Sequence, residues 1–278
     1  MKSQKEIVLD NILRQRVKEM VESFSPEDDL PLRLLDELLN NQEAKAVQDY
    51  ANTVSITRLG FNDHGPVHMR IVCKNAMKIL KIMHQAGVQT SLEQEGSGSF
   101  SDSMSAIILA SFLHDAGMAV GRKNHELYSG ILTYELIKKI LEKVLPGDSN
   151  IVRRVVISSL ALEGIVGHMA TNPIHSIEAG LILVSDGCDM TKGRARITLE
   201  SNNRPKEGDI HKYSASAIDS VKILPGTEKP VHIEVSMSGL VGFFQVEEVL
   251  IPKIHASTIH QHIELYAGVV GEDMKRYL

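Results

Sequence analysis

The stretch MSAIILASFLHDA, residues 104–116, decides the architecture of this chain. Nearly every side chain up to Leu113 is apolar or small, which is typical of a central helix that packs against neighbours on all sides. An imidazole and a carboxylate, His114 and Asp115, end this helix just before Gly117. An unpaired carboxylate there would carry a desolvation penalty on the order of several kcal/mol. The pair therefore either caps the helix or binds a cation that compensates its charge.

Amphipathic helices are predicted on both sides of this central helix. Ser3 and Glu6 have the spacing of a capping box, and apolar residues then recur at helical intervals up to Phe24. We expect further helices over residues 26–38, 63–87, 124–144, 150–163 and 174–190. The segment 91–105 is rich in Gly, Ser and acidic residues, and it predicts an exposed loop that is long enough to act as a lid.

The period of the apolar residues changes after residue 200. Val231, Ile233, Val235 and Met237 alternate with polar residues, which predicts a half-buried strand. Three further elements complete this pattern: a hairpin partner over 221–224, a short helix over 243–254 and a strand over 259–268. The chain is therefore expected to be mainly α, with an all-helical core and a small C-terminal α+β unit of order β-β-α-β.

The composition excludes several classes of protein. The chain has 278 residues, 43% of them hydrophobic and 23% charged, and its net charge of −5 lacks the basic excess of a general nucleic-acid binder. The two cysteines, Cys73 and Cys188, lie too far apart to form a CxxC motif. No segment approaches roughly 18 consecutive apolar residues, and the N-terminus lacks a signal-peptide pattern. We expect a soluble, cytoplasmic protein without a membrane partner.

Histidine is unusually frequent, with 12 residues against six Phe, six Tyr and no Trp. Helical spacing turns His68 and His125 toward the core, His168 lies in a glycine-flanked turn, and Asp186 closes an apolar run. Each of these is explained by an ordinary buried, hydrogen-bonded side chain when taken alone. Together with the central His-Asp pair they place donors at the ends of five helices, where one internal cavity can gather them.

Polar residues of the C-terminal unit have a simpler interpretation. They lie on the polar faces of predicted strands and are interpreted as the solvated face of a small sheet rather than as a second metal site. These residues are His232, His260, His262 and Glu264.

The order of the candidate ligands resembles the H…HD…D signature of the HD-domain metal-dependent phosphohydrolases. His68 comes first, His114 and Asp115 follow within SFLHDAGM, and Asp186 lies within LVSDGCDM. The resemblance covers about residues 60–200. It implies an all-helical core in which these four residues bind a divalent metal ion.

The same resemblance implies a second ion. Members of the family with two ions add histidines from the segment after the HD pair and from a later turn, which match His125 and His168, and Asp115 would then bridge the ions. The first ligand is His68 rather than His64, because apolar residues follow it at +4 and +8, as they follow the first ligand of the family.

One departure from the family concerns the substrate phosphate. Many members carry a lysine after HDxG, where this chain has Met118. Arg122 and Lys123 could substitute, as could the KGRAR run at 192–196, for which an ordinary solvated basic stretch is the alternative. The expected substrate-binding residues are Arg122, Lys192, Arg194, Arg196 and His211, with His114 and Asp115 as the catalytic pair.

The expected function is hydrolysis of a phosphomonoester or nucleotide phosphate bond by a metal-activated water, with one or two ions of Mn, Fe, Ni, Co, Zn or Mg. The alternative is an HD-type regulatory module that binds metal or nucleotide with little or no turnover. The expected partner is a small phosphorylated substrate, and the open edges of the sheet suggest a homodimer. The expected domains are a helical N-terminal extension over 1–50, an HD-type metal-binding domain over 51–203 and a small α+β domain over 204–278.

Overall fold

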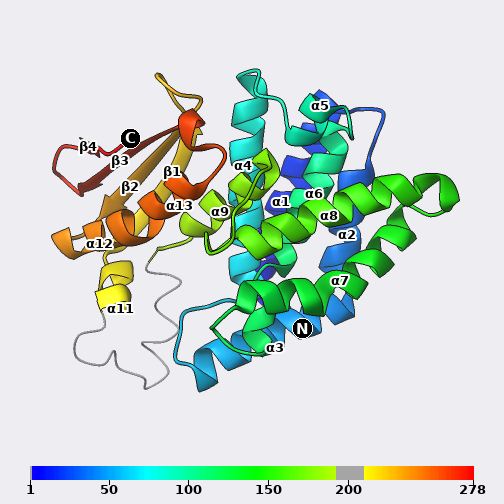
Figure 1. The fold of residues 1–278 in the computed structure, drawn as a ribbon. Helices are drawn as coiled ribbons and strands as arrows, with labels where there is room; N and C mark the ends of the chain where they lie inside the picture. The colour runs from blue at the N-terminus through cyan, green and yellow to red at the C-terminus, as the bar shows by residue number, and fades with distance from the viewer. Residues whose placement is uncertain (1, 192–209) are drawn as a thin grey trace.

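The computed structural model describes residues 2–191 and 210–278, except for the side chains of residues 211 and 212. Figure 1 shows a bundle of helices with a small sheet at one side. The bundle consists of α1 (Gln4–Phe24), α2 (Leu30–Asn40), α3 (Gln42–Thr53), η1 (Val54–Arg58), α4 (Pro66–Gln85), α5 (Ser91–Glu95), α6 (Phe100–Leu113), η2 (Ala116–Ala119), α7 (His125–Val144), η3 (Asp148–Asn150), α8 (Ile151–Gly167) and α9 (Ile177–Gly187).

The C-terminal part mixes strands with short helices. It consists of α11 (Ile210–Ser216), β1 (Ile218–Pro225), β2 (Val231–Met237), η4 (Leu240–Gly242), α12 (Phe243–Gln245), η5 (Val246–Leu250), α13 (Ile251–Ala256), η6 (His260–His262), β3 (Ile263–Val269) and β4 (Lys275–Arg276). The protein is therefore mainly α with a C-terminal α+β part, which confirms the predicted fold class. The predicted domain boundaries, one of which falls within residues 192–209, stay a prediction.

Helix α6 lies at the centre of the bundle. All of its residues from Phe100 to Leu113 are buried, and it packs against α2, α4, α8 and α9. Helix α8 comes close because residue 164 is a glycine: a Cβ atom there would lie 3.1 Å from the Cβ atom of Ala110. The apolar stretch is therefore the core of the bundle, as its sequence predicts, and the residues that follow it emerge at a buried point.

The expectation of an exposed loop over residues 91–105 is wrong. Helix α5 and the first turns of α6 lie in this segment, and each helix is started by a capping box, at Thr90 and at Ser99. The serines also link helices, since Ser103 is buried and donates a hydrogen bond to Glu178 at 2.6 Å. Serine and glycine indicate a loop when read as composition, but here the serines act as helix caps and as buried donors.

The C-terminal sheet has the strand order β1-β2-β3-β4. Strands β1 and β2 form the predicted antiparallel hairpin. Strand β3 lies parallel to β2, with Ile263 opposite Val231, so the chain crosses between them through α12 and α13. The short strand β4 then pairs antiparallel with β3, which the sequence pattern did not predict. The four alternating apolar residues of β2 are all buried, as expected for its inner face.

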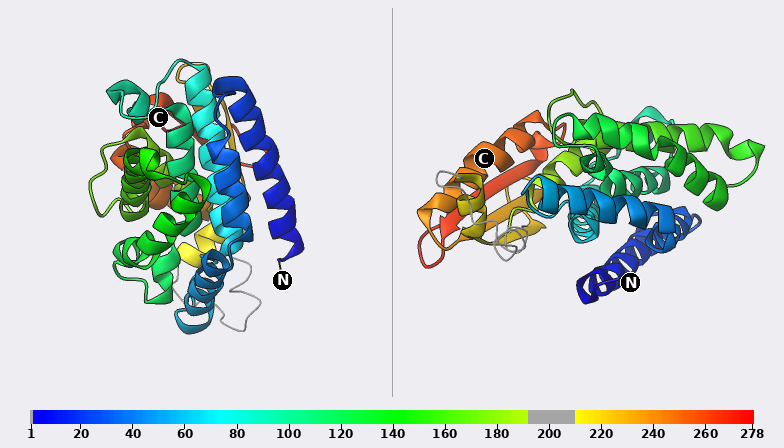
Figure 2. Two further views of the ribbon diagram at one scale, coloured as in Figure 1. Left: turned by 90° about the vertical axis from the view of Figure 1, so that its right-hand side faces the viewer. Right: turned by 90° about the horizontal axis from the view of Figure 1, so that it is seen from below.

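The C-terminal part packs against α4 and α9, and Figure 2 shows it at one end of the molecule. Gly180 of α9 permits the close contact, because a Cβ atom there would lie 2.3 Å from Oγ1 of Thr258. The Thr258 hydroxyl in turn donates to the Ser176 carbonyl at 2.7 Å. The C-terminal part is thereby held against the helix that carries Asp186. Within the described ranges, no helix has both the length and the apolar composition needed to cross a membrane.

Candidate metal centre

The six predicted metal ligands lie together where helix ends of the bundle meet. They come from the first turn of α4, the residues that follow α6, the start of α7, the end of α8 and the last turn of α9. All six are buried, and the most exposed of them retains 8% of its accessible surface. In chain order they are His68, His114, Asp115, His125, His168 and Asp186.

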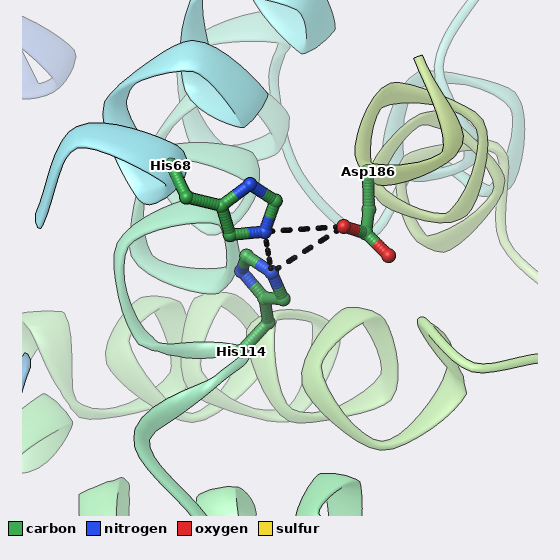
Figure 3. Close-up of side chains that lie close together, drawn as sticks. All are labelled: His68, His114 and Asp186. Atoms are coloured by element: carbon green, nitrogen blue, oxygen red, sulfur yellow. Dashed lines mark hydrogen bonds and ion pairs between the residues drawn. The ribbon is translucent and has the colours of Figure 1, made fainter. Parts of the chain in front are cut away.

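Four of these residues form the first donor group, which consists of His68, His114, Asp186 and atom Oδ2 of Asp115. Nε2 of His68 lies 3.2 Å from Nε2 of His114 and 3.1 Å from Oδ1 of Asp186, as Figure 3 shows. Oδ2 of Asp115 lies 3.2 Å and 3.3 Å from the same two nitrogens. Nε2 of His114 lies 3.9 Å from Oδ1 of Asp186. Ligands about 2.1 Å from one metal ion are about 3.0 to 3.4 Å apart in octahedral or tetrahedral geometry, so the four shorter separations suit a shared cation.

The second donor group consists of His125, His168 and the other oxygen of Asp115. Nε2 of His125 lies 3.1 Å from Nε2 of His168. Oδ1 of Asp115 lies 3.2 Å from the first of these nitrogens and 3.5 Å from the second. The two oxygens of one carboxylate therefore face two different sets of imidazoles, which is the arrangement of a ligand that bridges two ions.

Hydrogen bonds on the far side of each ring orient the imidazoles. Three of them donate from Nδ1 to the backbone carbonyl three residues earlier, at 3.0 Å for His114, 2.9 Å for His125 and 2.6 Å for His168. Nδ1 of His68 instead lies 2.7 Å from Oδ2 of Asp189. A proton on Nδ1 leaves the lone pair on Nε2, and such outer bonds are the usual support of metal-binding histidines.

The ionisation of the group also suits a metal ion. Burial works against ionisation of Asp115, but the imidazoles of His114 and His64 outweigh it and hold the pKa of Asp115 well below its usual range. Burial also lowers the pKa of His168 to about 4. At neutral pH the carboxyl is therefore charged and the imidazole neutral, which are the forms that coordinate metals.

One buried carboxylate oxygen of the group has no hydrogen-bond donor among the described residues. Within the part of the chain that the structure describes, Oδ2 of Asp115 is buried and has no hydrogen-bond donor. Nε2 of its neighbour His114 lies 3.3 Å away, and Nδ1 of the same ring already donates to the Ser111 carbonyl oxygen, so two acceptors face each other unless Nε2 is protonated as well. Such contacts are unfavourable unless a cation or a proton lies between them. Two sets of these buried side chains lie close enough to hold a metal ion, one of His68, His114 and Asp186 and the other of His114, Asp115 and His168.

Comparisons with known proteins identify an archaeal relative of this chain. No protein-family model and no solved structure matches the chain. The chain is 38% identical over 243 residues to the uncharacterized protein MJ1020 of Methanocaldococcus jannaschii, and the alignment covers 87% of this chain and 91% of that protein. The chain belongs to the family of this archaeal protein. The relative's name states no activity, so the role of the site in this chain rests on its geometry.

A cavity of about 920 Å³ opens beside the donor groups in this member of the family. Its walls come from η1 and the loop after it, from the turn before α7, from the residues that follow α8, from the end of α9 and from the C-terminal part. They include Asp115 and Asp186. Arg122 lies in the wall, with its guanidinium 5.7 Å from the centre of the Phe61 ring. This volume is within the usual range for small-molecule sites and admits a ligand to the donor groups.

His64 lies in the cavity wall and not among the donors. Its Nδ1 atom lies 2.7 Å from the carbonyl oxygen of Asn62 and 2.9 Å from Oγ of Ser55, and its Nε2 atom lies 3.5 Å from Arg122. The choice of His68 over His64 as the candidate ligand agrees with this geometry.

Sequence reasoning missed two residues that support the site. Asp189 holds Nδ1 of His68, although its place on the same helix face as Asp186 was a signal that could have suggested it. Lys253 reaches the site from α13, where its ammonium contacts Oδ2 of Asp186 and donates to the carbonyl oxygen of His168 at 3.0 Å. The only local signal for Lys253 was a single lysine within the apolar run VLIPKI.

Several predicted substrate contacts fall outside the described residues. Of the five, Arg122 lies in the cavity wall. The structure does not describe the segment that contains Lys192, Arg194 and Arg196. His211 lies in α11, but its side chain is not described.

The interpretation of Glu264 as part of a solvated sheet face is wrong. It is buried, with 1% of its surface exposed, and accepts hydrogen bonds from His232 at 2.8 Å and from the backbone N–H groups of residues 227–229. The hairpin turn between β1 and β2 folds over the carboxylate, which the alternation of polar and apolar residues could not indicate. The carboxylate therefore fastens the turn to β3.

Proposed function

We propose that the protein is an HD-domain metal-dependent phosphohydrolase that cleaves a phosphomonoester or nucleotide phosphate bond. The observation that carries the proposal is the division of the Asp115 carboxylate, with Oδ2 toward His68 and His114 and Oδ1 toward His125 and His168. The H…HD…D order of the sequence supports it, because the residues in that order are those of the buried donor groups.

The residues of the chain would hold two divalent ions through imidazole and carboxylate donors, with the first donor group around one ion and the second around the other. Bound ions supply a water of lowered pKa and withdraw charge from phosphate oxygens. Asp115 and the Nδ1 hydrogen bonds of the histidines keep the donors in place, so no side chain has to rearrange when a substrate enters. Such preorganisation is the main contribution of a protein to this class of reaction.

A cysteine nucleophile has no part in the proposal. Burial raises the pKa of both Cys73 and Cys188 to about 12, so both thiols stay protonated at neutral pH. Both side chains are also buried away from solvent. Nucleophilic attack by a thiolate would require a lowered pKa and access to the substrate.

The cavity supports a small phosphorylated substrate. It is large enough for a nucleotide-sized molecule, and Asp115 and Asp186 reach its surface. Arg122 brings a guanidinium to the same wall, beside the exposed ring of Phe61. A guanidinium binds phosphate oxygens in a forked geometry, and an aromatic ring offers a face to an apolar group of the substrate.

The test is a panel of phosphomonoesters and nucleotides assayed with Mn²⁺, Fe²⁺, Co²⁺, Ni²⁺ and Mg²⁺, together with the Asp115→Ala variant. We expect metal-dependent hydrolysis by the wild type and loss of at least about 100-fold in the variant, because a shared ligand of both donor groups is removed. Asp148→Ala, at an exposed carboxylate of η3, is the matched control.

Two results would count against the proposal. If the metal-loaded wild type hydrolyses none of the compounds, the enzyme proposal fails and a binding module with little turnover becomes the better description. If Asp115→Ala retains full activity, the assignment of the site fails.

A further inference from the structure

One lysine of the C-terminal part, Lys253, places its ammonium beside the candidate metal centre. Lys253 lies on α13, which packs against α9, and only 9% of its surface is exposed. Its ammonium contacts Oδ2 of Asp186, the oxygen turned away from His68, and lies 3.0 Å from the carbonyl oxygen of His168. One lysine therefore touches an element of each donor group.

The Lys253 ammonium has one more N–H donor than it has acceptors among the described residues. A lysine ammonium has three N–H donors and no acceptor. Oδ2 of Asp186 accepts one hydrogen bond from the ammonium, and the carbonyl oxygen of His168 accepts a second. Among the described residues no third acceptor lies within hydrogen-bond distance. Lys253 is also part of the cavity wall. The remaining N–H is thus available to an acceptor that enters the cavity.

The charges around the ammonium favour an anionic acceptor. Glu248 is the other charged residue that the C-terminal part contributes to the cavity wall, but its side chain is exposed and forms no ion pair with Lys253 among the described residues. The ammonium is instead paired with a carboxylate that faces the donor groups. When the Asp186 carboxylate coordinates a metal ion, its negative charge is shared between that ion and the Lys253 ammonium. The ammonium is then less fully neutralised and can bind a second anion.

We propose that Lys253 is a substrate-binding residue that donates its third N–H to a phosphate oxygen in the cavity. The other two N–H groups keep Asp186 and the backbone at His168 in place. This inference rests on the proposed phosphohydrolase function and makes the C-terminal part a component of the active site. It also gives the site a phosphate-binding cation that comes from the chain far beyond the HD pair.

The test measures binding of inorganic phosphate and of metal separately. Wild type, Lys253→Gln and Lys253→Met are loaded with Mn²⁺, their metal content is determined, and phosphate affinity is measured by calorimetry. We expect both variants to retain their metal while the Kd for phosphate rises about 10- to 100-fold, the usual effect of losing one charge-assisted hydrogen bond. Steady-state assays should show the same loss mainly in KM.

Controls separate this effect from misfolding and from a general change of charge. Lys222→Gln removes a cation from β1, where Lys222 pairs with Glu234 at 2.7 Å on the surface, and should leave phosphate binding unchanged. Thermal unfolding checks that the variants fold. The Gln variant retains a donor for Asp186, so it can stay folded even if the Met variant does not.

The outcomes distinguish this inference from the proposed function. If the wild type binds neither metal nor phosphate, the proposed function fails and this inference fails with it. If the wild type binds both and Lys253→Gln binds phosphate with equal affinity, only the role of Lys253 is overturned. If both variants lose their metal together with phosphate, Lys253 only positions Asp186 and the substrate contact is refuted.

Discussion

Replacing His125 or His168 with alanine should remove one of two bound metal ions. The second donor group has three protein donors, Oδ1 of Asp115 and one Nε2 atom from each histidine. Either variant leaves two donors there. The first donor group, with His68, His114, Asp186 and Oδ2 of Asp115, keeps all of its atoms.

The size of the effect follows from this count of donors. Loss of an outer-shell partner typically lowers metal affinity by about 10- to 100-fold, and loss of a direct ligand should exceed that. At a metal concentration that saturates the wild type, we therefore expect the metal content to fall from two ions per chain to one. Hydrolysis should fall as well, since the proposed chemistry uses both ions.

The assay is equilibrium dialysis against Mn²⁺ followed by elemental analysis, with titration calorimetry to separate the two affinities. His255→Ala is the matched control, because His255 is exposed and lies outside both donor groups. Equal metal content in the wild type and both variants would show a site for a single ion and refute the bridging role of Asp115. Loss of both ions in either variant would refute the independence of the two groups.

Three further predictions concern stability and reactivity. Burial opposes ionisation of Glu264, but its hydrogen bonds lower its pKa to about 2. The ionised carboxylate therefore stabilises the fold at pH values above the ordinary pKa of a glutamate. This stabilisation is lost as the pH falls toward 2. Glu264→Gln should therefore lower the free energy of unfolding by about 3 kcal/mol at pH 7 and by about half of that at pH 3, measured by urea unfolding, and an equal penalty at both pH values would contradict the reasoning. Gly117→Ala would place a Cβ atom 2.0 Å from the carbonyl oxygen of His125, so α7 must shift and the second ion should be lost; unchanged metal content would show that this contact is not needed. Cys73 and Cys188 should not react with a thiol reagent at pH 8 until the protein is unfolded, since burial raises both pKa values to about 12, and rapid labelling of the folded protein would refute this.

The periodicity of the sequence was sufficient for most helices and for the central strand. The capping box at Ser3 starts α1, and the alternation from Val231 marks β2, because both signals depend on residues close together in the chain. The segment 91–105 was misjudged for the same reason. Its serines indicate a loop by composition, and only their bonds across the bundle show that they serve helices.

The candidate ligands could be named from the sequence because donor type and helical phase are local properties and because their order resembles the H…HD…D signature. His68 was distinguished from His64 by the apolar residues that follow it at helical spacing. The support around these ligands could not be named in this way. Lys253 contacts Asp186 across 67 residues, and no pattern near either residue indicates the other.

The sequence by itself determined a mainly helical protein with a buried His-Asp pair at the end of its most apolar helix. It could do so because hydrophobic periodicity and residue type depend only on residues close together in the chain. Only the tertiary structure decided how the donors are divided. The two oxygens of Asp115 face different pairs of histidines because four helix ends meet around that carboxylate, and the ammonium of Lys253 reaches the site because α13 packs on α9. Both arrangements depend on packing between segments far apart in the chain.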